Sequence, residues 1–255
     1  MNSKPRRVRL DLAYDGTGFA GWQKQPGQRT VQGLLEAELT RVSGGDPVHV
    51  RGAGRTDAGV HARCQVADCE VNGRMDDDDL AHALRSVLPD DLRPLGVRTV
   101  PDDFHARRSA LFKTYRYHLD LSLSGDPFVG RYALHHPWEL DFEQIRRGLA
   151  LLPGKRDWSG FTASACEIEN RVRTLEEARL DLPQPGTAFL TFRADGFLTY
   201  MVRNLVGTLI EIGRGRMAAE RISQILETGD RGLAGPTAAA RGLSLQRVTY
   251  GSEGA

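Results

Sequence analysis

The stretch VRLDLAYDG, residues 8–16, alternates apolar and polar residues until it reaches Asp15-Gly16. Alternation with a period of two predicts a strand, and the Asp-Gly pair predicts a turn. Apolar residues then recur at helical spacing from Val31 to Val42, and a second helix begins after Asp76, a plausible N-cap. The remaining strand patterns cover residues 47–52, 62–71, 97–100 and 111–119. The order is β-α-β-β-α-β, which is the ferredoxin-like plan.

The second half of the chain repeats this plan loosely. Helices are expected over residues 141–152, 198–212 and 219–226, and strands over residues 172–182, 188–194 and 243–250. Because a helix does not separate every pair of strands, we expect an α+β fold with a mostly antiparallel sheet and helices packed on one side. Gly, Pro, Ser and aromatic residues gather between Leu121 and Trp138. We place a boundary there, between similar halves at residues 1–120 and 121–255.

Composition excludes several classes of protein. The chain has 255 residues, 26% of them charged, and a net charge of +1, which is typical of a globular protein. Its apolar runs are too short for a membrane span, and its N-terminus alternates rather than forming a signal peptide. The three cysteines, Cys64, Cys69 and Cys166, form no CxxC pair. They argue against a disulfide framework or structural zinc, and we expect buried free thiols in a cytoplasmic protein.

Charge is unevenly distributed along the chain. Acidic residues are concentrated in residues 68–79, whereas FHARRSALFKTYRYH, residues 104–118, has none. That second stretch interleaves aromatic residues with four cations, Arg107, Arg108, Lys113 and Arg116. This pattern suits a polyanion that also has flat bases, which means a nucleic acid. A solvated basic strand is the alternative.

The loop GAGRTDAGVHA, residues 52–62, carries a single carboxylate, Asp57. It lacks the Lys of a phosphate-binding loop and the third Gly of a dinucleotide fingerprint. A glycosidase normally needs a second acid, and the loop has none. Arg55 and Asp57 lie two residues apart, so on an extended segment they share a face, and the cation favours an ionised carboxylate that can act as nucleophile or base. The alternative is an Asp that hydrogen-bonds its own turn.

A second charged residue lies in an apolar context. LTYMVRNLVGTLIEIG, residues 198–213, is apolar on most sides and contains Arg203. A buried Arg requires an acidic partner, since an unpaired buried charge is costly. Asp57 is a candidate partner; alternatively, Arg203 lies at the helix edge and extends to solvent.

The loop closely resembles the catalytic motif of the TruA family of tRNA pseudouridine synthases. The resemblance covers nearly the whole chain, because further motifs follow in the family's order. They are YDGTGFAGWQ (14–23), TVQGLLE (30–36), FHAR (104–107), KTYRY (113–117), MVRNLVG (201–207) and GLSLQRVTY (242–250). The pair GRTDAGVHA and MVRN is highly specific.

This resemblance implies an isomerase that needs no cofactor and no metal. It implies conversion of uridine to pseudouridine at positions 38, 39 and 40 of the tRNA anticodon stem-loop, in a cleft between the two halves, by a homodimer. Asp57 matches the essential Asp, which attacks either the base or the sugar. The other matches are Arg55 for base flipping, Tyr115 for stacking, Arg203 for pairing with the Asp, and Leu243 for lining the pocket. The cations Arg107, Arg108, Lys113 and Arg116 would then neutralise tRNA phosphates.

The chain departs from the family pattern at Cys64, Tyr200 and Ser244. These departures concern the pocket wall and the choice of tRNA rather than the reaction. We interpret His61 and His105 as structural or RNA-contacting residues, not as metal ligands. Two other functions compete: a non-catalytic RNA-binding or RNA-chaperone protein, and an Asp-nucleophile enzyme that acts on small phosphates.

Overall fold

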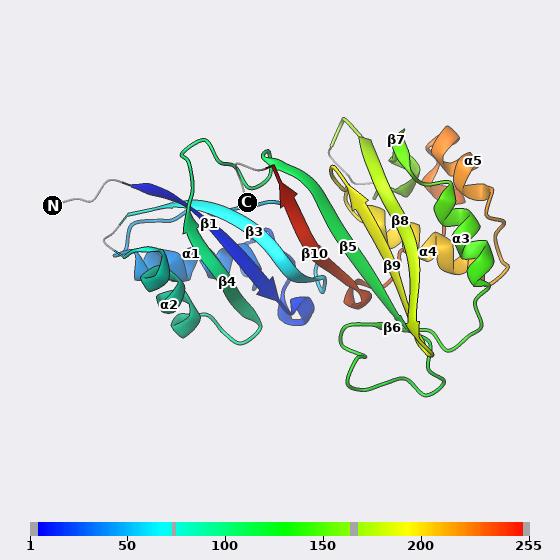
Figure 1. Ribbon diagram of the computed structural model, residues 1–255, viewed down its shortest axis with the longest axis horizontal. Helices are drawn as coiled ribbons and strands as arrows, with labels where there is room; N and C mark the ends of the chain where they lie inside the picture. The colour runs from blue at the N-terminus through cyan, green and yellow to red at the C-terminus, as the bar shows by residue number, and fades with distance from the viewer. Residues whose placement is uncertain (1–4, 73–74, 164–167, 252–255) are drawn as a thin grey trace. The chain divides into compact units, whose positions relative to one another are not determined.

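The computed structural model describes residues 5–72, 75–163 and 168–251, which contain ten strands and five α-helices in an α+β arrangement. The chain forms two compact units (Figure 1). The first unit comprises Met1–Leu111 and Leu245–Ala255, and the second comprises Phe112–Ser244. The boundary at residues 111 and 112 precedes the expected one at 120 and 121, and the chain returns to the first unit near its C-terminal end.

The first unit contains α1 and α2 on the same side of its strands (Figure 1). Its elements are β1 (Arg6–Tyr14), α1 (Val31–Val42), β2 (Arg51–Gly52), β3 (His61–Val71), α2 (Asp77–Val87), β4 (Leu92–Thr99) and most of β10 (Leu243–Tyr250). The strand order is β4-β1-β3, and β2 and β10 also lie beside β3. β1 is antiparallel to both neighbours, with Leu10 opposite Ala67 and Val97.

The core of this unit follows from the alternation in its first strand. Val8, Leu10 and Leu12 are fully buried, as the period of two predicts. Burying a side chain of this size contributes about 1.5–3 kcal/mol. Asp76 caps α2 by accepting a hydrogen bond from Asp79 N–H at 2.9 Å, which confirms the expected helix start.

The second unit contains α3, α4 and α5. Its elements are β5 (Ala110–Asp120), β6 (Leu134–His135), α3 (Phe142–Ala150), β7 (Gly154–Asp157), β8 (Val172–Gln184), β9 (Thr187–Ala194), α4 (Met201–Gly213) and α5 (Arg221–Thr228). The strand order is β5-β9-β8-β7 with antiparallel pairs, and the short β6 runs parallel to β5. Across the described residues, single-turn 3-10 helices cover Gly16–Gly18, Ser159–Phe161, Arg231–Leu233 and Ala240–Gly242.

The structure differs from the sequence-based expectation at several elements. β4 begins at Leu92 rather than Val97, and β7 has no counterpart in the expectation. α4 begins at Met201 rather than Leu198. Its apolar side chains are buried within the chain. The description of the chain as two ferredoxin-like halves stays a prediction.

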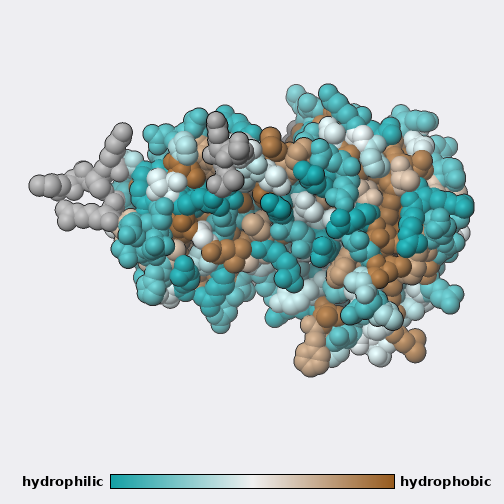
Figure 2. Space-filling model, viewed as in Figure 1, coloured by the Kyte–Doolittle hydropathy of each residue, from teal (hydrophilic) through white to brown (hydrophobic). Residues whose placement is uncertain are grey.

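Exposed apolar side chains are gathered in the loop between β5 and β6. Leu123 is 88% exposed and Phe128 is 90% exposed. Figure 2 shows brown groups at this loop, together with further brown groups among the teal surface of the same face. Cys69 is a buried free thiol, as expected, whereas Cys64 is free but only half-buried. Cys166 lies outside the described residues.

Candidate active site

The loop that carries Asp57 joins β2 to β3 and is attached to the segment that follows β1. Trp22 N–H donates a hydrogen bond to the Thr56 carbonyl at 3.0 Å. Gly59 N–H donates to the Phe19 carbonyl at 3.3 Å. These two main-chain bonds lie on either side of Asp57 in the sequence, so they fix the backbone from which its side chain projects.

Two glycines allow this close approach. Gly21 has φ +91°, and a Cβ there would lie 2.7 Å from the Thr56 carbonyl oxygen. A Cβ at Gly52 would lie 2.5 Å from the indole ring of Trp22. Such separations leave no room for a side chain at either position. Gly52 therefore makes room for the indole ring of Trp22.

Buried side chains hold the same loop in place through hydrogen bonds. The hydroxyls of Tyr14 and Thr56 are hydrogen-bonded at 2.9 Å. Gln65 Nε2 donates to the Tyr14 hydroxyl at 3.4 Å and to the Gly54 carbonyl at 2.9 Å. Burial raises the pKa of Tyr14 to about 12, so its phenol stays neutral. Sequence reasoning missed these supporting residues, although Tyr14 and Trp22 lie in the YDGTGFAGWQ motif.

The loop presents its polar side chains unequally. Thr56 is buried, whereas Arg55 on one side is exposed and Asp57 on the other is partly exposed. The Asp57 carbonyl accepts from Val60 N–H at 3.1 Å and closes a turn through the main chain. Solvent or a ligand can therefore reach both Arg55 and Asp57.

Both histidines in the candidate region organise backbone. His61 is buried, and its Nδ1 accepts a hydrogen bond from Gly16 N–H at 3.0 Å. His105 Nδ1 accepts from Arg107 N–H at 3.2 Å. Each ring therefore has a structural role, in agreement with the sequence-based interpretation.

The turn that carries Arg107 and Arg108 is anchored at the residue before them. Ala106 N–H donates to Asp68 Oδ1 at 2.8 Å, and the Ala106 carbonyl accepts from the Tyr250 hydroxyl at 2.7 Å. Burial raises the pKa of Asp68, and the bond from Ala106 opposes that rise. Arg107 and Arg108 are exposed, so two cations project from a fixed turn.

In the second unit, β5 divides the KTYRY motif between its two faces. Tyr115 lies opposite Phe192 of β9, and its ring meets the ring of Phe197 edge-on with centroids 5.0 Å apart. Lys113 is two residues away and shares the buried face of Tyr115. Arg116 points to the other face. The four cations grouped by sequence reasoning are therefore not one continuous surface.

Arg203 lies in the first turn of α4 and is partly buried. Its Nε donates to the Ala238 carbonyl at 2.8 Å, and its own carbonyl accepts from Ala238 N–H at 3.1 Å. Its guanidinium carbon lies 4.8 Å from the ring centroid of Tyr200. The side chain is thus oriented within its own unit.

The segment that contacts Arg203 is attached along α4. A Cβ at Gly207 would lie 1.7 Å from the Pro236 carbonyl oxygen, so only glycine permits this contact. The Thr237 hydroxyl donates to Asn204 Oδ1 at 2.6 Å. The same segment leads to Leu243, which is buried at the start of β10. The MVRNLVG motif therefore both carries Arg203 and fixes the segment that orients it.

The predicted site residues are divided between the two units. Those in the first unit are Arg55, Asp57, Arg107 and Arg108. Those in the second unit are Lys113, Tyr115, Arg116, Arg203 and Leu243. Each group is built by its own unit, and the pairing of Asp57 with Arg203 stays a prediction.

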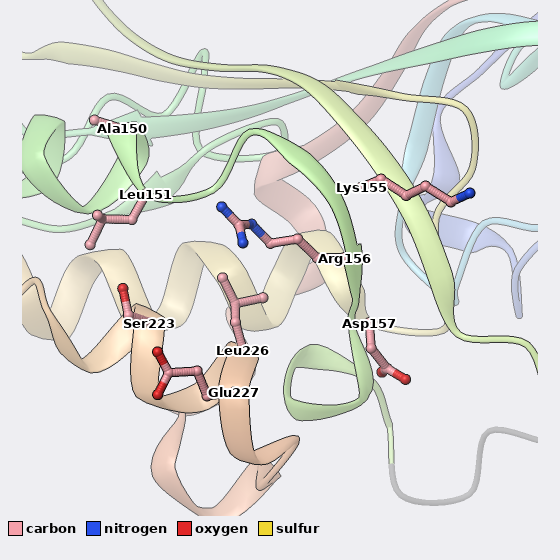
Figure 3. A pocket seen from close by; sticks show the side chains of 8 residues that line it. All are labelled: Ala150, Leu151, Lys155, Arg156, Asp157, Ser223, Leu226 and Glu227. Carbon is pink, nitrogen blue, oxygen red and sulfur yellow. The ribbon is translucent and has the colours of Figure 1, made fainter.

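A surface cavity of about 400 Å³ lies elsewhere on the second unit (Figure 3). It is lined by Ala150, Leu151, Lys155, Arg156, Asp157, Ser223, Leu226 and Glu227. None of the predicted site residues lines it.

Within residues 5–72, 75–163 and 168–251, no three His, Cys, Asp or Glu side chains are arranged to hold a metal ion. No helix in the described part of the chain has both the length and the apolar character needed to span a membrane.

Comparisons with known proteins give one consistent result. A sequence model described as tRNA pseudouridine synthase matches residues 12–107 and 149–251. The tRNA pseudouridine synthase A of Streptococcus mutans serotype c is 44% identical over 245 residues, which cover 96% of this chain and 98% of that protein. The protein of the same name from Streptococcus sanguinis is 43% identical over 246 residues, with the same coverage.

Proposed function

The chain belongs to the tRNA pseudouridine synthase family, whose members are isomerases, and from that premise we propose that it converts uridine to pseudouridine at positions 38, 39 and 40 of the tRNA anticodon stem-loop, with Asp57 as the catalytic carboxylate. The observation that carries the proposal is the way the Asp57 loop is built. Main-chain bonds to Trp22 and Phe19 and the buried Tyr14–Thr56 bond anchor a loop that carries one partly exposed carboxylate. Such preorganisation is what a positioned nucleophile needs.

The reaction is an isomerisation, so atoms and charge balance within the substrate. The bond between uracil N1 and ribose C1′ breaks, the base turns, and C5 bonds to C1′ while the C5 proton is lost and N1 gains one. Asp57 would form the covalent intermediate with either the base or the sugar. The chemistry requires the uridine to leave the helical stack, which costs a few kcal/mol.

The remaining residues support these steps in the proposal. Tyr115 stacks on the extracted base, which returns about 1–3 kcal/mol. Arg203 pairs with the Asp57 carboxylate and keeps it ionised, and Leu243 lines the pocket. Arg55 helps to extract the base from its exposed position beside Asp57.

The exposure of the basic side chains indicates which of them can contact tRNA phosphates. Arg107 and Arg108 project from an anchored turn and are well placed to neutralise tRNA phosphates. Lys113 and Arg116 occupy opposite faces of β5, and of the two only the partly exposed Arg116 is accessible to a phosphate, whereas Lys113 is buried. We further propose a cytoplasmic homodimer in which two ferredoxin-like halves of each chain enclose the catalytic cleft.

The decisive experiment compares wild type with Asp57→Asn on an unmodified tRNA that has uridines at positions 38–40. Pseudouridine is measured by mass spectrometry after carbodiimide labelling, and binding by gel shift. We expect product with wild type, none with the variant, and tRNA binding by both. Asn keeps the size of the side chain but removes the carboxylate. Binding of tRNA by the variant therefore shows that its fold is intact.

The binding-only alternative gives the opposite result. If wild type binds these tRNAs but forms no pseudouridine, the synthase proposal is wrong and an RNA-binding or RNA-chaperone role replaces it. Family membership removes the motivation for an enzyme that acts on small phosphates.

A further inference from the structure

Tyr200 has an unusual backbone. Its φ of 61° and ψ of 3° place it in the left-handed region, and it is the one non-glycine residue with positive φ within the described ranges. This conformation is unfavourable for a residue with a Cβ, and it persists only where the surroundings enforce it. An outlier of this kind needs a reason at its own position.

The start of α4 does not supply that reason. Tyr200 is the N-cap residue of α4, where Ser, Thr, Asp, Asn or Gly is favoured, and its side chain makes no capping bond. Core packing does not supply it either, because Tyr200 is 40% exposed. Asn or Gly would satisfy the backbone better.

The Tyr200 ring makes a contact with a predicted site residue. It lies 4.8 Å from the guanidinium carbon of Arg203, within the range of a cation–π interaction. The same guanidinium donates from Nε to the Ala238 carbonyl at 2.8 Å. The hydrogen bond directs the guanidinium at one edge, and the aromatic ring covers one of its faces. Together these contacts restrict a side chain that has many rotamers.

We propose that Tyr200 is a positioning residue that holds the Arg203 guanidinium in the orientation needed to pair with Asp57. The inference rests on the proposed function, because it assumes that Arg203 acts on the catalytic carboxylate. Tyr200 touches neither the carboxylate nor the reacting atoms in this scheme. Its aromatic face is the required property, and its hydroxyl is not.

Three substitutions separate the ring from the backbone. Tyr200→Phe keeps the ring, whereas Tyr200→Asn and Tyr200→Gly remove it and suit the left-handed backbone. We expect Asn and Gly to lower the single-turnover rate constant at saturating tRNA about 5- to 30-fold, the range of a cation–π contact. Phe should stay within about 2-fold of wild type, since it retains the same contact. Thermal unfolding should show no loss of stability in the Gly variant.

A double-substitution cycle tests whether Tyr200 acts through Arg203. In an Arg203→Ala background, Tyr200→Asn should have almost no further effect on the rate, since the group it positions is absent. The affinity for tRNA, measured by gel shift, should be the same for the single variants and wild type. A merely structural role for Tyr200 would lower stability or binding and would not depend on Arg203.

Each contrary outcome is recognisable. If Tyr200→Asn slows the reaction equally in both backgrounds, or weakens tRNA binding without changing the saturated rate, the ring acts on the RNA and the inference is wrong. If wild type is active and the Asn and Gly variants match it, the inference alone is overturned. If wild type makes no pseudouridine, the proposed function fails and the role of Tyr200 fails with it.

Discussion

At the scale of single residues, glycines determine where the Asp57 loop lies. Gly21 approaches Thr56 so closely that no side chain fits between them, and Gly52 does the same for Trp22. The glycines of YDGTGFAGWQ and GAGRTDAGVHA are therefore contact residues between two parts of the chain. Replacing one tests whether the loop's position matters for catalysis.

Gly21→Ala should reduce both stability and activity. The added Cβ would lie 2.7 Å from the Thr56 carbonyl, at a residue whose φ is +91°. We expect about 2–4 kcal/mol of destabilisation, from left-handed strain and overpacking together. A loop displaced by about 1 Å can lose up to about 100-fold in rate. Chemical denaturation and single-turnover assays measure the two effects.

Gly27→Ala is the matched control. Gly27 also has positive φ, at +70°, but nothing lies within 4 Å of an added Cβ. It should lose only the backbone strain, about 1–2 kcal/mol, and keep its activity. Equal activity losses in the two variants would mean that contact with Thr56 is not what positions Asp57.

At the scale of elements, the long periodic segments were predictable and the edges were not. β1, α1, β3 and α2 follow from periodicity and from the Asp76 cap. The start of β4 was missed because Pro94 and Gly96 read as breaks. β4 lies at an edge of the strand order and has a register shift where Leu12 meets Pro94, so proline is tolerated there. β7, with the sequence GKRD, is short and polar and gave no signal.

Only part of the candidate site was predictable from the sequence, because some of its residues act through contacts between distant parts of the chain. The carboxylate, its neighbouring Arg and the Arg of α4 stand out as charges in unusual contexts. Tyr14, Thr56 and Gln65 do not, because their role depends on hydrogen bonds between residues far apart in the chain. The left-handed backbone of Tyr200 was not predictable either, because a tyrosine does not indicate positive φ as Gly or Asn would.

The end of β5 provides a pH-dependent prediction. Asp120 is buried, and its carboxylate accepts hydrogen bonds from Ser122 N–H and Oγ and from Asp126 N–H. Burial raises the pKa of Asp120, but these hydrogen bonds outweigh it, so the net pKa is lowered. The carboxylate therefore stabilises the fold above its unfolded pKa, and this contribution is lost as pH falls through the folded value.

Asp120→Asn should lower the midpoint of thermal unfolding at pH 7 by a few degrees, since hydrogen bonds to a charged group contribute about 1.5–3 kcal/mol each and Asn replaces part of them. The difference from wild type should shrink as the pH falls below about 4, where the unfolded carboxyl is protonated. Thermal scans between pH 3 and 7 measure it. A difference that stays constant with pH would show that the charge of Asp120 contributes nothing.

At the scale of the whole molecule, the proposed site needs residues from both units. Asp57 belongs to the first unit, and Tyr115, Arg203 and Leu243 belong to the second. In the proposed homodimer, Asp57 of one chain could share a site with Arg203 of the same chain or with Arg203 of the other chain. An experiment that mixes two variants distinguishes these two arrangements.

A mixture of Asp57→Asn and Arg203→Ala should form pseudouridine no faster than the slow Arg203→Ala variant does alone. If the residues of one site come from the same chain, no exchange of subunits can unite Asp57 and Arg203 in a mixed dimer. Analytical ultracentrifugation establishes the dimer, and a tag on one variant confirms that mixed dimers form. Recovery of pseudouridine formation in the mixture would show instead that the site is shared between chains.

The discontinuous first unit also affects synthesis of the protein. Its strand β10 lies beside β3, yet residues 112–244 separate the two parts of this unit in the chain. A ribosome therefore synthesises the whole second unit before the segment that finishes the first. Until residues 245–251 are made, the sheet that carries the Asp57 loop lacks its strand β10. A ribosome that stalls before residue 245 leaves a chain whose edge at β3 is open, and such an edge is a site for aggregation and for proteolysis.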